Sequence, residues 1–132
     1  MQDKKNFYID GKWVSPIEPR NYKVIDPSNE KPCAEISLGG KKDIDKAVSA
    51  AKKAFETWAF SKKEERLELL EKLYVVYKKR WAEMAKLIST EMGAPMKFST
   101  EMQSATGASH IKSFKNILKD FRFEKDLGEE KN

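Results

Sequence analysis

The sequence predicts an α+β fold in which two N-terminal β-hairpins precede three or four amphipathic helices. Residues 1–40 contain short strand-prone runs separated by turn residues. From residue 41 onward, apolar residues recur every three or four positions, the spacing of a helix that buries one side. The period changes at Gly39-Gly40, which divides the chain into a β-hairpin region, 1–40, and a helical region, 41–120.

The composition of the 132 residues is that of a folded protein, with 39% hydrophobic and 11% aromatic residues. The net charge is +5, but acidic residues are interleaved with the basic ones, so a nucleic-acid surface is not indicated. No apolar run approaches the roughly 18 residues of a membrane helix, and the N-terminus lacks the apolar core of a secretory signal. A single cysteine, Cys33, cannot form an intrachain disulfide. We therefore expect a cytoplasmic protein with no nucleic-acid or membrane partner.

Residues 1–40 contain two hairpin signals. In the first, Asp10-Gly11, a pair that favours positive φ, separates the strand-prone runs 7–9 and 12–14. In the second, turn residues at 26–29 separate a β-prone run at 22–25 from an alternating run at 33–38. One alternating set is expected to be buried and the other exposed, the two sets being Ala34, Ile36, Leu38 and Cys33, Glu35, Ser37.

The first helix is predicted from about Lys42 to Trp58, after a strand-to-helix turn at Gly39-Gly40. Its stripe of apolar residues is rich in alanine, which predicts a close packing partner: Ile44, Ala47, Val48, Ala51, Ala54, Phe55 and Trp58. Only a few residues link this helix to the next one, which favours an antiparallel helical pair.

The longest helical signal runs from Ser61 to Gly93. Ser61 and Glu64 have the spacing of a capping box, and Gly93 followed by Pro95 ends the helix. We expect a rod of about 45 Å, either unbroken or jogged near residues 78–80. Its apolar stripe consists of Leu67, Leu70, Leu73, Tyr74, Tyr77, Trp81, Met84, Ala85 and Ile88.

A further helix follows Pro95, with a looser apolar stripe that Gly107 interrupts at a cost of about 1 kcal/mol relative to alanine. Ser99 or Thr100 is the expected N-cap of this helix. From Phe121 apolar and charged residues alternate, as in an exposed strand, so residues 121–132 are predicted to start a new strand.

Few residues suggest chemistry. Cys33 lacks the electropositive setting that a reactive thiolate needs, and His110, the only histidine, has no second metal-ligating residue near it in sequence. Gly39-Gly40 lacks the other residues of a phosphate loop. Four carboxylates are expected on the solvated side of the long helix, where they support it: Glu64, Glu65, Glu68 and Glu71. No catalytic, cofactor-binding or metal-binding residue is therefore predicted.

Several motifs occur in a fixed order along nearly the whole chain: FYIDGKWV, VIDPSNEKPCAEIS, DIDKAVSAAKKAFETW, the ERLELLEKL run with Arg66, and STEMGAP. In this order and at this spacing they resemble the N-terminal segment of the aldehyde dehydrogenase superfamily. Two positions depart from the family pattern, because Asp26 stands where asparagine is common and Ala94 where lysine is frequent.

The resemblance implies the N-terminal part of the α/β aldehyde dehydrogenase fold, without most of the Rossmann-like and catalytic domains. Family members are oxidoreductases that use NAD or NADP to convert an aldehyde to a carboxylic acid. Residues 41–120 would pack on the cofactor domain of the parent enzyme, and residues 121–132 would start the bridging strand of a homo-oligomer.

The expected function is accordingly that of an N-terminal fragment whose partner is the remainder of the parent chain. It would bind no cofactor and be inactive alone. The alternative is a stand-alone helical interaction module derived from an enzyme scaffold.

Overall fold

The computed structural model describes residues 2–128 and confirms the predicted order of hairpins followed by helices. The strands are β1 (Gln2–Lys4), β2 (Phe7–Ile9), β3 (Lys12–Val14), β4 (Asn21–Asp26) and β5 (Lys31–Ser37). The helices are α1 (Lys41–Trp58), α2 (Lys63–Lys79), α3 (Trp81–Met92), α4 (Met96–Phe98), the π-helical turn η1 (Ser99–Gln103) and α5 (Ser104–Asp120). None of the helices within this range is long and apolar enough to span a membrane.

Both hairpins form where the turn residues predict them. β2 and β3 pair antiparallel, and Asp10 and Gly11 both have positive φ, 54° and 73°, as a tight hairpin turn of this length requires. β4 and β5 also pair antiparallel. Their turn is closed by Asp26, whose carboxylate accepts hydrogen bonds from the Ser28 backbone N–H at 2.8 Å and the Ser28 hydroxyl at 2.6 Å.

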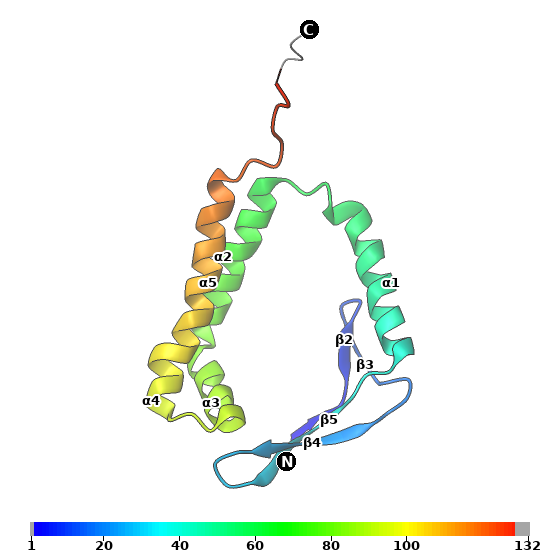
Figure 1. Ribbon diagram of the computed structural model, residues 1–132, viewed down its shortest axis with the longest axis vertical. Helices are drawn as coiled ribbons and strands as arrows, with labels where there is room; N and C mark the ends of the chain where they lie inside the picture. Colours follow the sequence, from blue (N-terminus) through cyan, green and yellow to red (C-terminus); the bar gives the residue numbers. More distant parts are fainter. Residues whose placement is uncertain (1, 129–132) are drawn as a thin grey trace.

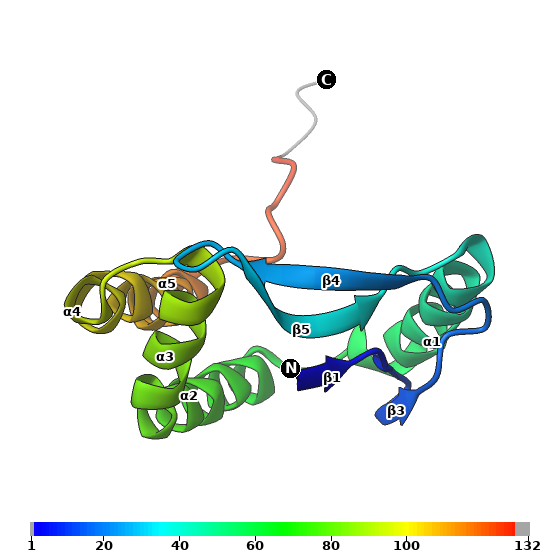
Figure 2. The same cartoon turned by 90° about the horizontal axis from the view of Figure 1, so that it is seen from below.

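The strand β1 is not predicted by the sequence pattern. It pairs parallel with β5, which becomes the central strand of a sheet with the order β1-β5-β4 (Figure 2). The predicted separation of β5 into a buried and an exposed face is wrong, because residues 33–36 are all half-buried, Ser37 is buried and Leu38 is exposed. Residues 33–36 are half-buried because β5 has a neighbouring strand at each edge. The polar Ser37 side chain can be buried because its hydroxyl oxygen accepts the Arg20 N–H at 3.0 Å.

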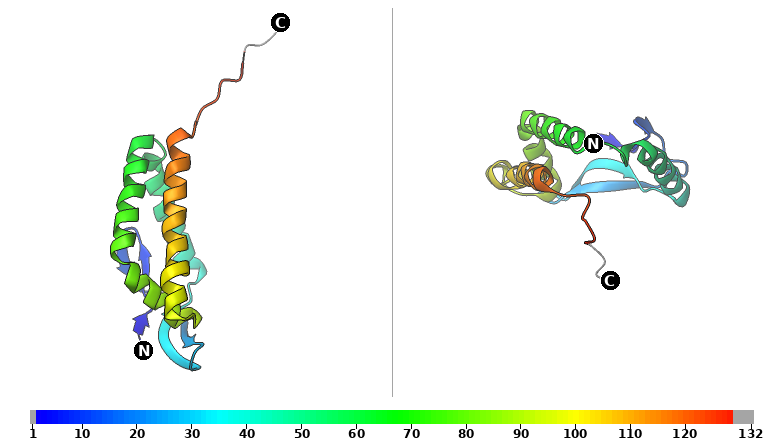
Figure 3. Two further views of the ribbon diagram at one scale, coloured as in Figure 1. Left: turned by 90° about the vertical axis from the view of Figure 1, so that its left-hand side faces the viewer. Right: turned by 90° about the horizontal axis from the view of Figure 1, so that it is seen from above.

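The predicted pairing of the first two helices is also wrong. α1 and α2 run in opposite directions but stand apart, and α2 lies side by side with α5 instead (Figures 1 and 3). A short link fixes only the distance between adjacent helix ends. Here it turns at Ala59 and then extends at Lys62 (φ −70°, ψ 154°), which carries α2 away from α1. Within the described residues, the alanine-rich side of α1 therefore lies beside the small β2–β3 hairpin.

The long helical stretch is jogged at Arg80, between α2 and α3, as one of the two expected forms allows. Its N-cap lies one residue later than predicted. Lys62 is the N-cap and its backbone N–H donates to the Glu65 carboxylate at 2.8 Å. Ser61 does not cap α2, because its hydroxyl donates to the Trp58 carbonyl oxygen at the end of α1.

The C-terminal end of α3 confirms the predicted stop. Gly93 adopts the left-handed conformation (φ 69°), which an L-residue with a side chain rarely takes. A Cβ at this position would lie 3.0 Å from Cγ of Pro27, so the β4–β5 turn packs directly on the end of α3.

The last helical stretch is continuous from Met96 to Asp120 and contains the π-helical turn η1. Neither Ser99 nor Thr100 caps it, since Pro95 is the N-cap and proline is well tolerated at a helix start. Two aromatic side chains bind its backbone: the Trp81 indole N–H donates to the Thr100 carbonyl oxygen at 3.0 Å, and the Tyr77 hydroxyl to that of Ser104 at 2.9 Å.

After α5 the chain continues from Phe121 with extended dihedral angles (φ −69°, ψ 127°), and it forms no strand up to residue 128. Residues 129–132 of the predicted strand lie outside the described residues. The strand at 121–132 stays a prediction.

We predict that Gly107→Ala destabilises the protein, although alanine normally stabilises a helix. A Cβ at Gly107 would lie 2.5 Å from Oη and 2.8 Å from Cζ of Tyr77, so either the Tyr77 ring would have to leave its hydrogen bond to Ser104 or α5 and α2 would have to separate. Overpacking of this kind costs about 1–3 kcal/mol of unfolding free energy. Urea unfolding should show this loss for Gly107→Ala and none for Ser113→Ala, at an exposed position of the same helix.

A second comparison checks the cause. In a Tyr77→Phe background the nearest atom is gone, so the loss caused by Gly107→Ala should shrink. An equal loss in both backgrounds would show that the contact with Tyr77 is not responsible.

Candidate functional site

The structure does not bring the two potentially reactive side chains together. Cys33 lies half-buried in β5, and its thiol donates to the Val24 carbonyl oxygen at 3.4 Å. His110 is exposed on α5, an element that does not pack against β5. Within residues 2–128, no three His, Cys, Asp or Glu side chains gather into a group that could hold a metal ion. That neither residue acts in catalysis stays a prediction.

Of the four carboxylates that the sequence predicts on the solvated side of the long helix, Glu65, Glu68 and Glu71 each have a different surrounding in α2. Glu65 caps the helix, and Glu68 forms an ion pair with Lys72 one turn later at 2.7 Å. Glu71 does not lie on the solvated side as predicted, because it is half-buried and forms an ion pair with Lys115 of α5. These contacts are those of helix support and helix packing.

The start of α1 is closed by the carboxylate of Asp43, which is only 5% exposed. One oxygen accepts the Gly40 N–H at 2.9 Å, and the other accepts the N–H of Ile17 at 3.0 Å, from the segment between β3 and β4. The Gly40 and Ile17 donors hold the pKa of Asp43 below its ordinary value. Asp43 thus ties the helix to the connection between the two hairpins, a role that its position in the first turn alone does not reveal.

A dinucleotide cofactor does not fit this helix start. Phosphate groups bind helix N-termini through free backbone N–H groups, often in a glycine-rich turn. At Gly39-Gly40 the Gly40 N–H is already taken by Asp43, and an incoming anion would meet that buried negative charge.

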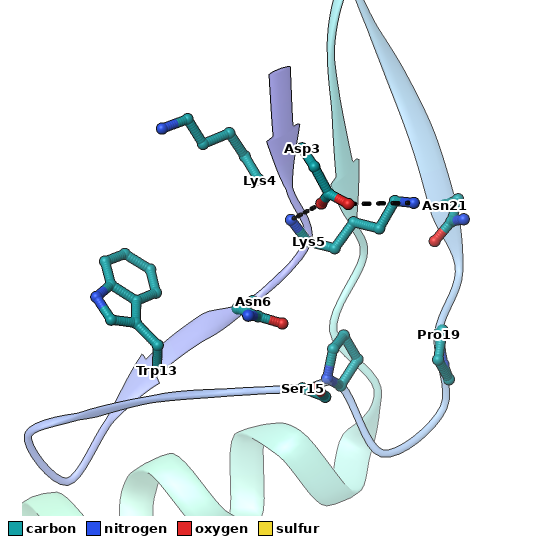
Figure 4. Close-up of a pocket in the computed structure, with 9 residues that line it drawn as sticks. Asp3, Lys4, Lys5, Asn6, Trp13, Ser15, Pro19 and Asn21 are labelled. Atoms are coloured by element: carbon teal, nitrogen blue, oxygen red, sulfur yellow. Dashed lines mark hydrogen bonds and ion pairs between the residues drawn. The ribbon is translucent and has the colours of Figure 1, made fainter. Parts of the chain in front are cut away.

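A pocket of about 680 Å³ lies between β1, the β3–β4 connection and the start of β4, and two of its charged side chains, Asp3 and Lys5, form an ion pair (Figure 4). Lys5 lies 2.6 Å from a carboxylate oxygen of Glu35 and 3.7 Å from one of Asp3. The hydrogen bond that the Lys5 ammonium donates to the Glu35 carboxylate raises the pKa of Lys5, which keeps the ammonium charged. The rest of the lining provides no nucleophile with an adjacent base; it consists of Lys4, Asn6, Trp13, Ser15, Pro16, Pro19 and Asn21.

The most prominent surface feature is apolar. Along one side of α1, five residues form what we call the α1 face: Ile44, Val48, Ala51, Phe55 and Trp58. All five are exposed, Ile44 to 60% and Phe55 to 65%. A groove of about 330 Å³ runs beside it, between the alanines of α1 and the β2–β3 turn. Four exposed side chains give the last helical stretch a similar character: Phe98, Met102, Phe114 and Ile117.

The total accessible surface shows how incomplete the core is. The chain exposes 11032 Å². A closed monomer of its mass, 15.2 kDa, is expected to expose about 7,100 Å². In the part of the chain that the structure describes, only three apolar residues are buried: Ile9, Ala85 and Ala108. The apolar side chains of the described residues are therefore largely uncovered, whereas a closed domain packs its apolar layers against each other.

Comparisons with known proteins identify the larger fold. The sequence model of the aldehyde dehydrogenase family matches residues 13–128. The 3-succinoylsemialdehyde-pyridine dehydrogenase of a Pseudomonas species is 42% identical over 129 residues, which are 97% of this chain and 27% of that protein. The crystal structure of an aldehyde dehydrogenase from Bartonella henselae is 50% identical, with a TM-score of 0.94 over 98% of this chain and 27% of its own.

A third similar protein was solved with ligands. A mutant of aldehyde dehydrogenase C from Pseudomonas syringae, in complex with NAD+ and octanal, is 33% identical with a TM-score of 0.90, over 94% of this chain and 26% of its own. These matches define the class of fold as that of the N-terminal quarter of aldehyde dehydrogenases. The chain belongs to the aldehyde dehydrogenase family. It spans about a quarter of the length of the curated relatives that it matches, 27% for the Pseudomonas protein.

We predict that Asp43 makes stability depend on acid pH. Because its folded-state pKa lies below the ordinary value of 3.8, the carboxylate stabilises the folded chain above that pH, and the stabilisation is lost as the pH falls through the folded pKa. Asp43→Asn should lower the urea midpoint at neutral pH, and the difference from the wild type should shrink in acid. Asp45→Asn, at an exposed site of the same turn, is the control.

We also predict that the isolated chain self-associates at micromolar concentration and binds a hydrophobic dye such as ANS, because its apolar faces are uncovered. Phe55→Lys should reduce dye binding, whereas Ser49→Lys, which adds the same charge at an exposed polar site, should not. Sedimentation measures the association. A compact monomer with negligible dye binding would contradict this prediction.

Proposed function

We propose that the chain is the N-terminal segment of an NAD(P)-dependent aldehyde dehydrogenase, and that the whole protein oxidises an aldehyde to a carboxylic acid. The observation that carries the proposal is the exposed surface of 11032 Å², about one and a half times that of a closed monomer of this mass. The match to about a quarter of each relative supports it, since the rest of such a protein would supply the covering layer.

In this proposal the parts of the chain have separate tasks. The helical region, 41–120, packs on the cofactor domain, and the α1 face is the surface through which it does so. The hairpin region, 1–40, braces the start of α1 through the hydrogen bond from Ile17 to Asp43. Residues 121–132 begin the strand that leads to the remainder of the chain and to a homo-oligomer in the cytoplasm.

The cofactor of the whole protein is NAD or NADP in this proposal, in keeping with the Pseudomonas syringae relative that was solved with NAD+. It would supply hydride transfer. Because the helix start at Gly40 is closed by Asp43, the residues of this chain orient and support the cofactor domain and do not themselves hold the dinucleotide.

Reconstitution tests the proposal. The Bartonella henselae enzyme without the 27% that matches this chain is produced as a separate polypeptide. It is then mixed with this chain, NAD and an aldehyde. We expect NADH formation only in the mixture, because neither chain alone has both the scaffold and the catalytic parts. A Val48→Asp variant should fail to restore activity, whereas Ser49→Asp, at an exposed polar site beside it, should restore it.

Two results would contradict the proposal. NAD(P)H formation by the chain alone that Cys33→Ser abolishes would make Cys33 a nucleophile. A natural stop directly after codon 132 in the coding DNA would favour the stand-alone interaction module, whereas an in-frame continuation with a glycine-rich turn and a catalytic cysteine would support the enzyme.

A further inference from the structure

The guanidinium group of Arg66, in the first turn of α2, reaches back to the end of α1. Its Nη2 donates to the carbonyl oxygens of Trp58 and Ala59, both at 3.2 Å, and its Nε donates to the Ser61 hydroxyl at 2.8 Å. The last carbonyl groups of a helix lack donors within the helix, and the helix dipole favours a cation there. Arg66 therefore closes α1 from outside it.

The same group faces two aromatic rings. Its central carbon lies 5.7 Å from the ring centre of Trp58 and 5.4 Å from that of Phe123, both within the range of a cation–π contact. Phe123 belongs to residues 121–128, which we call the exit segment because there the chain leaves α5 (Figure 1). Its ring packs edge-on against Phe121, with centres 4.9 Å apart.

A second contact joins the same two regions. The Lys63 ammonium donates to the Lys119 carbonyl oxygen at 2.8 Å, in the last turn of α5. The start of α2 thus binds the end of α1 through Arg66 and the end of α5 through Lys63. The exit segment begins where these three helix ends are linked, although it forms no strand of its own within residues 121–128.

We propose that Arg66 is a positioning residue that sets the direction in which the exit segment leaves α5. The Arg66 guanidinium group binds the end of α1 with its N–H donors, and its central carbon lies over the Phe123 ring. The path of the exit segment is therefore fixed relative to the α1–α2 link. A lysine cannot replace it, because a single ammonium lacks both the fork of donors and the flat surface. That this contact also directs the remainder of a longer chain rests on the function proposed above; the contact itself does not.

Trypsin cleavage after Arg122 in the isolated chain tests the inference, because the held segment must open before it is cut. The rate of cleavage after Arg122 in each protein variant is divided by the rate of the same cleavage in a free peptide with the sequence of residues 119–128, and this ratio measures how often the segment opens. Arg66→Ala and Arg66→Lys should both raise the ratio about two- to fivefold, the size expected for an exposed cation–π pair. Lys72→Ala, which removes a positive charge from an exposed site on α2, should leave it unchanged.

A double variant distinguishes a loss of the Arg66–Phe123 contact from a general destabilisation of the chain. Phe123→Leu should raise the ratio by a similar factor when compared with its own peptide, and adding Arg66→Lys to it should change nothing further. If Arg66→Ala unfolds the chain, Arg66→Lys and Phe123→Leu still decide the question. Unchanged cleavage in Arg66→Lys, or factors that multiply in the double variant, would overturn the inference.

Discussion

The close approach of α2 and α5 is the contact on which the helical half of the structure depends. It is possible because Gly107 has no side chain where the Tyr77 ring lies, and the Tyr77 hydroxyl then reaches the Ser104 carbonyl oxygen. One turn later Trp81 binds the Thr100 carbonyl oxygen inside the π-helical turn. The two aromatic residues, which pack edge-on with ring centres 6.1 Å apart, fix both the separation of the helices and the bend between α2 and α3. α1 has no part in this contact, and its apolar side is left over.

The exposed apolar side of α1 is the feature on which the proposed place of this chain in a larger protein depends. The helical pair and the three-stranded sheet bury almost no large apolar side chain. Hydrogen bonds hold the segments together locally. Asp43 joins α1 to the connection between the hairpins, and Arg66 joins the end of α1 to α2. A segment held in shape by such ties can present a preformed apolar surface to the rest of its family's fold, which lowers the cost of docking.

The sequence predicts those elements whose cause is local. The turn at Asp10-Gly11 and the helix end at Gly93 follow from the positive φ that these residues accept. The features that the sequence does not predict depend on residues far apart in the chain. The strand β1 consists of three polar residues and forms because they pair in parallel with β5. The packing of α2 on α5 depends on the contact between Tyr77 and Gly107. The close packing partner that the alanines of α1 predict stays a prediction, because within the described residues Ala51 and Ala54 are exposed beside the β2–β3 turn. For the candidate site, the motif order identifies the family, whereas the link from Asp43 to Ile17 joins segments 26 positions apart and leaves no pattern.

The large exposed surface also determines how the isolated segment would melt. An unfolded chain of 15.2 kDa exposes about 22,000 Å², so folding hides only about half of it, against about two thirds in a closed domain of this size. Both the denaturant dependence and the heat-capacity change of unfolding scale with newly exposed area. For the isolated chain each is therefore expected to be about three quarters of the value usual for this length, with a correspondingly broad transition. If the chain belongs to a longer dehydrogenase as proposed, the cooperativity of the isolated segment understates that of the whole protein.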